Sequence, residues 1–153
     1  MMAADYATFY LGGHYFGVLA NHVLEVNHDL EITYVPKSPK TIRGIMNLRG
    51  QLLPAIDMYE KLGLPQPEEK QEKISIILQS DSMLLALLVD DVGPIIPLED
   101  DTFEAPPNNF PVTSRELVLG VHKLPENLII ILDKKGIVNF NHHKNLPTTP
   151  RIN

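Results

Sequence analysis

Short apolar runs, separated by glycine, proline or charged residues, make up most of this chain. Residues 6–11 alternate between two faces, Gly12 and Gly13 follow, and residues 14–19 form a second run. Two such runs around a Gly-Gly pair predict a β-hairpin, because both glycines accept the positive φ that its turn requires. Further short runs predict strands at residues 32–35, 93–98, 117–122 and 127–132.

The most regular stretch covers residues 42–58, which read IRGIMNLRGQLLPAIDM. Two apolar runs flank Gly50 and predict a second hairpin, with Asn47 and Arg49 near the end of its first strand, where they should be half-buried. Arg49 is either a solvated cation that protects an edge strand from aggregation or a cation presented to a partner on a rigid corner. Pro54 predicts that the second strand lies at an edge or carries a bulge, because proline donates no backbone hydrogen bond.

A third hairpin is predicted over residues 74–79 and 83–89, which are almost all apolar. Strands without alternation are buried on both faces, so this hairpin is expected in the middle of the structure. The acidic pair Asp90-Asp91 follows directly. Before a Gly-Pro sequence, such a pair favours turn chemistry, in which aspartate bonds nearby backbone amides, over catalysis.

Helices are expected to be short and to lie at residues 20–26, 57–62 and 133–138. Asp57 is a candidate cap for the second helix, and Gly63 a candidate stop. Thirteen prolines argue against longer helices. About nine or ten short strands with such brief helical turns indicate an all-β barrel or sandwich.

The chain of 153 residues is long enough for one domain or for two small subdomains with a shared core. Residues 65–73 (PQPEEKQEK) are polar and charged and predict a linker that tolerates change. Residues 99–111 predict an extended loop, and residues 139–153 predict a flexible C-terminal tail.

Composition argues against several classes of function. Without cysteine, the chain has no disulfide, no thiolate metal site and no cysteine nucleophile. Its formal net charge of −6 disfavours binding to nucleic acids and to anionic membranes, since both attract clustered Lys and Arg. No apolar run reaches membrane-spanning length and residues 1–5 do not resemble a signal peptide, so a soluble cytoplasmic protein is the default expectation.

Motifs of catalysis and cofactor binding are missing as well. The sequence has no phosphate-binding G-x-x-x-x-G-K loop, no G-x-G-x-x-G motif and no G-x-S-x-G elbow. His22 and His28 do not have the four-residue spacing that places two histidines on one helix face, so no metal site is expected there. His142-His143 lack the partner residues of a metal site. An enzyme is not expected, although the residues of a catalytic triad can assemble from distant positions.

The string IRGIMNLRGQLLPAID closely resembles the central motif of CheW-type chemotaxis adaptors, G-I-x-N-L-R-G-x-x-x-P-x-I-D. The positions that match at fixed spacing are Gly44, Ile45, Asn47, Leu48, Arg49, Gly50, Pro54, Ile56 and Asp57. The resemblance runs from Tyr6 to Asp133 and includes LGGHYFGVLANHVLEV, LLVDDVGPIIPL and GVHKLPENLIIILD.

The resemblance implies an all-β fold of two small SH3-like five-stranded β-barrels packed together, with short helical turns. It implies a single CheW-like domain over residues 6–138, followed by the tail at 139–153. Family members are scaffolds rather than enzymes and use no cofactor. They join the regulatory domain of a CheA-type histidine kinase to the cytoplasmic tip of chemoreceptors, so this chain is expected at membrane-associated receptor arrays through its partners, without inserting into the membrane.

The resemblance also implies two groups of partner-binding residues. The first matches the family motif that lies near the receptor-contacting groove: Asn47, Leu48, Arg49 and Gly50. The second matches a short helical segment that is also implicated in partner contacts: Val23, Glu25 and Val26. Which of these residues contact the receptor and which the kinase is left open.

The chain departs from the family pattern at two places. Lys134-Lys135 stand where a C-terminal helix usually begins with acidic and apolar residues, and Tyr59 stands where Arg is common. Adaptors of related pathways, such as twitching motility, share this fold and give an alternative function. A generic signalling β-barrel with another partner and a small-molecule-binding barrel are alternatives from other classes.

Overall fold

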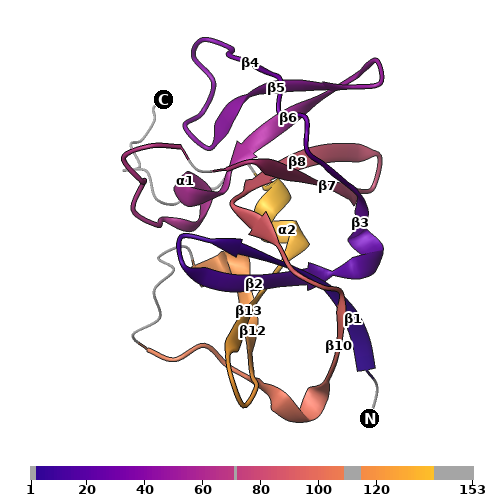
Figure 1. Ribbon diagram of the computed structural model, residues 1–153, viewed down its shortest axis with the longest axis vertical. Helices are drawn as coiled ribbons and strands as arrows, with labels where there is room; N and C mark the ends of the chain where they lie inside the picture. Colours follow the sequence, from indigo (N-terminus) through magenta and orange to yellow (C-terminus); the bar gives the residue numbers. More distant parts are fainter. Residues whose placement is uncertain (1–2, 71, 109–114, 140–153) are drawn as a thin grey trace, which may run out of the picture.

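The computed structural model describes residues 3–70, 72–108 and 115–139. Within them the chain forms two β-sheets, which occupy the lower and upper halves of the molecule in Figure 1. The lower sheet comes from the two ends of the chain, coloured indigo and orange to yellow, and the upper sheet mainly from the purple and magenta middle. The chain therefore begins in one sheet, builds the other and returns.

The first sheet has the strand order β10-β1-β2-β13-β12-β11, and β9 also pairs with β1. Its strands are β1 Ala3–Leu11, β2 His14–Leu19, β9 Asp91–Val92, β10 Ile96–Glu99, β11 Phe103–Glu104, β12 Val118–Lys123 and β13 Leu128–Leu132. Gly12 and Gly13 form the β1–β2 turn with φ values of 60° and 81°, as the Gly-Gly pair predicts.

The second sheet has the strand order β3-β7-β8-β6-β5-β4. Its strands are β3 Val23–Asn27, β4 Ile32–Thr33, β5 Ile42–Leu48, β6 Gln51–Asp57, β7 Ile74–Ser80 and β8 Met83–Val89. Each sheet combines antiparallel pairs with one parallel pair, β2–β13 in the first and β6–β8 in the second. Without the two-residue strands β4, β9 and β11, each sheet keeps five strands in the described part of the chain, which matches the predicted all-β fold of two packed units.

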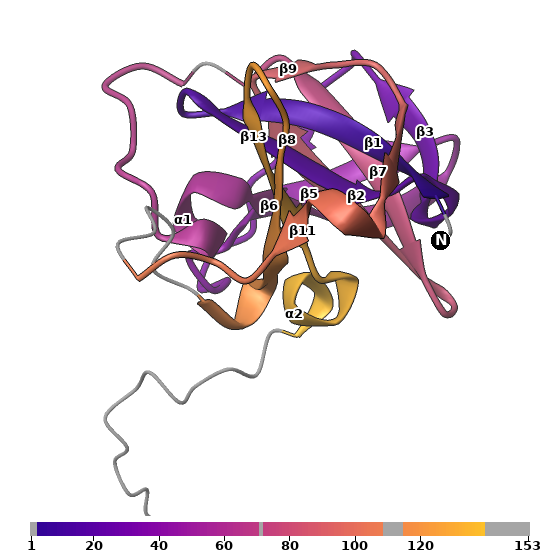
Figure 2. The same cartoon turned by 90° about the horizontal axis from the view of Figure 1, so that it is seen from below.

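The largest hydrophobic cluster contains residues of both sheets and of both α-helices. Phe9 and Phe16 stack in it, with ring centroids 5.5 Å apart. Ile76 and Leu85 enter it from the second sheet. Figures 1 and 2 both place the β1–β2 hairpin against the β7–β8 hairpin, so the two sheets share one core.

Strand β7 shows why an all-apolar run belongs in the middle of the fold. Ile76 and Leu78 join the shared cluster, whereas Ile77 between them joins a cluster made only by the second sheet. Both faces of the strand are buried, and β7 and β8 lie inside the strand order. The prediction of a central, doubly buried hairpin is confirmed.

Two α-helices and three 3₁₀ turns complete the described structure. They are α1 Met58–Leu62, α2 Lys134–Val138, η1 Ala20–His22, η2 Asp100–Thr102 and η3 Arg115–Leu117. The Asp57 carboxylate accepts the Glu60 N–H at 3.1 Å, and Gly63 ends α1 with a φ of 75°, so both predicted signals of this helix are confirmed. Asp133 caps α2 in the same way, by accepting the Lys135 N–H at 3.0 Å.

Three local predictions need correction. The predicted helix at 20–26 is helical only in η1, because Val23–Asn27 pairs with β7 as an edge strand, and its ladder hydrogen bonds replace those of a helix. Pro54 does not lie in an edge strand, because β6 pairs with both β5 and β8. The register of the β5–β6 ladder does shift beside it, but between Ile42 and Gly44 of β5, opposite Ile56 and Ala55, and the parallel ladder to β8 starts only at Ala55. The predicted loop after residue 99 contains η2 and β11.

The predicted C-terminal tail, apart from Asn139, lies outside the described residues.

Candidate partner-binding surface

The β5–β6 hairpin turns on Arg49 and Gly50. Leu48 pairs with Gln51, so these two residues form the loop, and their φ values are 52° and 88°. Two positive φ values are typical of a two-residue turn whose twist matches that of the strands. The Asn47 Oδ1 atom accepts the Gly50 N–H at 2.8 Å and stabilises the turn.

Arg49 therefore lies in the turn itself. This corrects the prediction, based on its apolar neighbours, that it lies near the end of a half-buried strand. Its side chain is 70% exposed. A positive φ disfavours any residue with a Cβ atom, and asparagine or glycine would occupy this position at lower cost. An arginine kept in a strained turn is a reason to look for a function in its side chain.

The guanidinium of Arg49 reaches Glu25 on β3. Its Nη1 atom donates to Oε1 of the carboxylate at 3.4 Å, and its Nη2 atom donates to Oε2. This hydrogen bonding lowers the pKa of Glu25, so both partners are charged near neutral pH. Since β3 lies at one end of the strand order and β5 near the other, the ion pair joins the two ends of a strongly bent sheet.

A cavity of about 350 Å³ opens beside this ion pair, between the two sheets. Its lining comes from β1, η1, β3 and β7, and from the segment that follows β8. Large apolar side chains stand exposed on its rim: Leu24 at 50%, Val26 at 40% and Ile95 at 64%. Glu25 belongs to this lining as well, so the Arg49 corner and the apolar cavity form one surface, called the groove below.

The predicted partner-binding residues are only partly brought together. Glu25, Val26 and Arg49 lie at the groove, and Val23 lines it while packing partly against the shared core. Asn47 is exposed and, with Gly50, shapes the turn.

Leu48 is different, because it is only 5% exposed and belongs to the core of the second sheet. In this geometry its side chain packs inside the sheet, and its predicted role in partner binding stays a prediction. Sequence reasoning also missed Leu24 and Ile95 of the groove. Both are apolar residues with exposed side chains, Leu24 on a strand and Ile95 in a segment flanked by prolines. Their exposure can be recognised only when the strands that pack around them are known.

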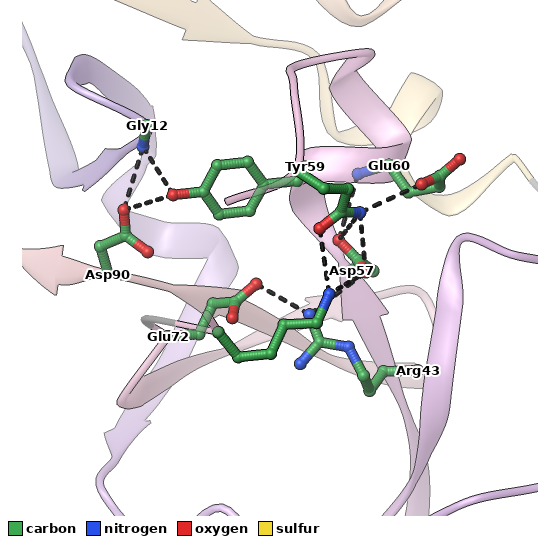
Figure 3. Close-up of polar contacts among 9 residues, drawn as sticks. Gly12, Arg43, Asp57, Tyr59, Glu60, Glu72 and Asp90 are labelled. Carbon is green, nitrogen blue, oxygen red and sulfur yellow. Dashed lines mark hydrogen bonds and ion pairs between the residues drawn. The ribbon is translucent and has the colours of Figure 1, made fainter. Parts of the chain in front are cut away.

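A second polar cluster lies near the N-terminus of α1. From the sequence alone, its residues were interpreted as parts of turns and of a linker. Figure 3 shows Arg43 between Asp57 and Glu72. Its Nη2 atom lies 3.2 Å from Asp57 Oδ2 and 2.8 Å from Glu72 Oε2. Lys70 approaches Asp57 at 3.9 Å. The described residues of the predicted linker, 65–70 and 72–73, lie outside helices and strands, and the buried Glu72 side chain anchors this segment; that the linker tolerates change stays a prediction.

Beside it, Tyr59 and Asp90 connect α1 to the two hairpins β1–β2 and β7–β8. The Tyr59 hydroxyl donates to Asp90 Oδ2 at 2.7 Å, and the Gly12 N–H reaches both side chains at 3.0 Å (Figure 3). Burial, followed by this bond to Asp90, raises the pKa of Tyr59. Asp91 bonds the N–H of Val92 at 2.9 Å. Both acids of the Asp90-Asp91 pair therefore bond backbone amides, as the turn interpretation predicts.

Within residues 3–70, 72–108 and 115–139, no group of three or more His, Asp and Glu side chains is arranged to hold a metal ion. None of the helices found in the same ranges has the length and apolar character needed to cross a membrane. His142 and His143 lie outside the described residues.

Comparison with known proteins gives a consistent result. Residues 5–141 match the CheW-like domain family. The chain is 26% identical over 129 residues to a probable chemotaxis protein CheW of Rhizobium etli, covering 84% of this chain and 83% of that protein. It is 32% identical over 96 residues to Protein PilI of Pseudomonas aeruginosa, covering 62% of this chain and 53% of that one. The crystal structure of the scaffolding protein TtCheW from Thermoanaerobacter tengcongensis matches with a TM-score of 0.77 at 30% identity, over 86% of this chain and 90% of that chain.

Proposed function

Because the chain belongs to the CheW-like domain family, we propose that it is a non-enzymatic adaptor that joins the cytoplasmic tip of chemoreceptors to the regulatory domain of a CheA-type histidine kinase. The residues 6–138 act as one domain in this proposal. The adaptor works in the cytoplasm and reaches membrane-associated receptor arrays through its partners.

The groove is the observation that carries the proposal. Exposed Leu24, Val26 and Ile95 surround a cavity of about 350 Å³, with Arg49 and Glu25 at its edge. An amphipathic helix binds such a surface with apolar side chains spaced three and four residues apart. A charged pair beside an apolar groove orients the helix, since unlike charges on the partner lower the energy in only one register. We assign the groove to the helical receptor tip.

The mechanism we propose is a preference for one arrangement of the complex. An adaptor changes the activity of a kinase only as far as it binds one kinase arrangement better than another. The bonded, buried polar clusters around Arg43 and Tyr59 suit this role, because they hold the two sheets and the linker rigid without offering a nucleophile. Modest interfaces would allow an array to assemble and exchange its parts.

An adaptor of a related pathway, such as twitching motility, is the alternative. The similarity to Protein PilI favours it, but that similarity covers a smaller share of both chains than the similarity to the CheW protein of Rhizobium etli. A generic signalling barrel with a different partner is a further alternative. The same binding experiment separates these possibilities when kinases and receptors of both pathways are used.

Calorimetric titration of the full chain with a kinase regulatory domain and with a receptor-tip fragment from the same genome tests the proposal. We expect binding to both, and Arg49→Glu should weaken receptor binding by on the order of tenfold or more while kinase binding persists. Lys40→Glu makes the same change of charge at an exposed position away from the groove and should bind like the wild type. Loss of kinase binding instead would move Arg49 to the kinase interface. Binding to neither partner would rule out the proposed function.

A further inference from the structure

A second cavity, of about 260 Å³, opens on the other side of η1 from the groove. Apolar side chains of β1, β2, β12 and β13 line it, among them Tyr6, Leu19 and Ile131. Leu119 lines it too and is 53% exposed. The register of the β12–β13 ladder shifts between Val118 and Gly120, so Leu119 occupies a bulge that turns its side chain away from the pairing.

The rim of this cavity is basic. Its positive charge comes from Lys134 and Lys135 of α2, and His22 of η1 lies beside them. Burial, followed by the charge of Lys134, lowers the pKa of His22. Asp133 is the acid of this lining, and its carboxylate caps the Lys135 N–H. We call this surface the lysine-rimmed cavity.

The two lysines are neighbours in the chain and, over the described ranges, have no carboxylate partner. Neither Lys134 nor Lys135 makes an ion pair there, which they share with the separate exposed lysines Lys37, Lys40 and Lys73. What distinguishes them is that both line one cavity. Cations gathered beside one another repel, and a carboxylate from outside would relieve the repulsion. A cluster of this kind on a chain with a net charge of −6 is complementary to an acidic partner.

Residues 140–153 contain His142, His143, Lys144 and Arg151, and no Asp or Glu, so their side chains offer no carboxylate to the two lysines. The complementary ligand is a protein segment in which carboxylates surround one large apolar side chain. That apolar side chain would pack against the exposed Leu119 and its neighbours in the cavity.

The position of the cavity suits a second partner of an adaptor. The lysine-rimmed cavity and the groove share no lining residue. A protein that joins two partners needs two surfaces that are occupied at the same time. We propose that the lysine-rimmed cavity docks an acidic, apolar-anchored segment of the kinase regulatory domain, while the groove holds the receptor tip. This inference rests on the proposed function, because that function supplies the two partners.

Charge reversal of both lysines tests the inference. The double variant Lys134→Glu, Lys135→Glu should weaken binding of the full chain to the kinase regulatory domain by on the order of tenfold or more, with receptor-tip binding and melting temperature unchanged. The wild-type affinity for the kinase domain should fall as salt is added, and the variant should lose most of that dependence. The matched control Lys40→Glu, Lys73→Glu changes the net charge equally at two exposed positions and should bind both partners like the wild type.

Two further variants keep the test independent of folding. Lys134→Gln, Lys135→Gln removes the charges without adding acids and should weaken kinase binding by a smaller factor. Leu119→Ser should weaken it at unchanged charge, since it removes the exposed apolar contact.

Undiminished kinase binding in both lysine variants would overturn the inference and leave the adaptor function standing. A wild-type chain that binds no kinase domain would overturn both. Concentration-dependent dimers in sedimentation that the charge reversal abolishes, with kinase binding intact, would identify a second copy of the chain as the occupant and overturn the kinase assignment.

Discussion

Arg43 lies between two carboxylates that are almost completely withdrawn from water. The side-chain exposures are 7% for Asp57 and 1% for Glu72, against 23% for Arg43 itself. Removing water from a carboxylate is costly unless a cation and hydrogen bonds replace it. The guanidinium therefore makes the burial of Glu72, and with it the anchoring of the 65–73 segment, possible.

Replacing Arg43 by Met should lower the free energy of unfolding by about 2–4 kcal/mol, because it leaves two buried carboxylates without their main cation. This loss of stability is smaller than that expected for breaking a fully buried ion pair, because the Arg43 side chain keeps some exposure to water. Urea denaturation followed by circular dichroism measures it. The double variant Arg43→Met, Glu72→Gln should cost less than Arg43→Met alone, since it removes one of the unpaired charges. Equal stability of Arg43→Met and the exposed-site variant Arg49→Met would contradict this explanation.

Lys61 of α1 is a buried amine whose Nζ atom donates to the backbone oxygen of Asn139 at 2.9 Å. Burial lowers its pKa to about 8, from an ordinary value of 10.5, although Glu116 acts in the opposite direction. The unfolded chain keeps the ordinary pKa, so between these two values it binds more protons than the folded chain. By linkage, stability then rises with pH across that interval.

The melting temperature should accordingly rise between about pH 7.5 and about pH 9.5, and Lys61→Met should flatten this rise. Measurements should stop at that pH, because Tyr59 lowers stability above pH 10. Burial raises its pKa, so the folded state then keeps a proton that the unfolded state loses. Differential scanning calorimetry at several pH values measures both effects. A rise of the same size in Lys61→Met would exclude Lys61 as its source.

At the scale of one element, the β5–β6 hairpin combines a structural cost with an exposed cation. Arg49 has a φ of 52° in a turn position where Asn-Gly is the sequence that hairpins prefer. Its guanidinium gains an ion pair with Glu25, but that pair is exposed and screened by salt. Local turn chemistry and the identity of this residue therefore disagree, as they often do at binding surfaces.

Arg49→Asn should keep or raise the melting temperature while weakening receptor binding by on the order of tenfold. The reason is that Asn accepts the left-handed conformation more readily than Arg but does not reach a partner or Glu25. Thermal unfolding and calorimetric titration, run on the same protein, separate the two effects. Glu25→Gln is the matched variant at the other end of the ion pair. A marked fall in melting temperature for Arg49→Asn would show that the arginine is kept for stability.

For the molecule as a whole, the largest core belongs to neither sheet alone. Phe16 of β2, Leu87 of β8, Leu62 of α1 and Ile137 of α2 all enter the shared cluster. The first sheet is also built from the two ends of the described chain, so it forms only when the C-terminal strands return to it. Neither sheet buries its shared face without the other.

Unfolding should therefore be a single cooperative transition, with the two sheets losing structure together. Phe16→Ala should lower stability by about 3–5 kcal/mol, and it should reduce the hydrogen-exchange protection of β7 and β8 as well as that of β1 and β2. Hydrogen exchange measured by mass spectrometry on the variant and the wild type tests this. Loss of protection confined to the first sheet, or two separate thermal transitions, would contradict a shared core.

Some features of this protein follow from the sequence by itself, because a few neighbouring residues decide them. The Gly12-Gly13 turn needs only two residues that accept positive φ, and the Asp57 cap needs one carboxylate before the helix it caps. The buried β7–β8 hairpin follows from two runs with almost no polar residue. The central motif likewise predicted the all-β fold that the family match and the two packed sheets confirm.

Other features depended on residues far apart in the chain, and only the tertiary structure decided them. Val23–Asn27 is a strand because β7 offers it hydrogen bonds, although its own sequence also suits a helical turn. Arg49 meets Glu25 because the second sheet bends until its ends approach, and Glu72 is buried because Arg43 arrives from another strand. In each case the energy comes from a partner that local sequence does not contain, so the groove and the anchored 65–73 segment became visible only in the folded chain.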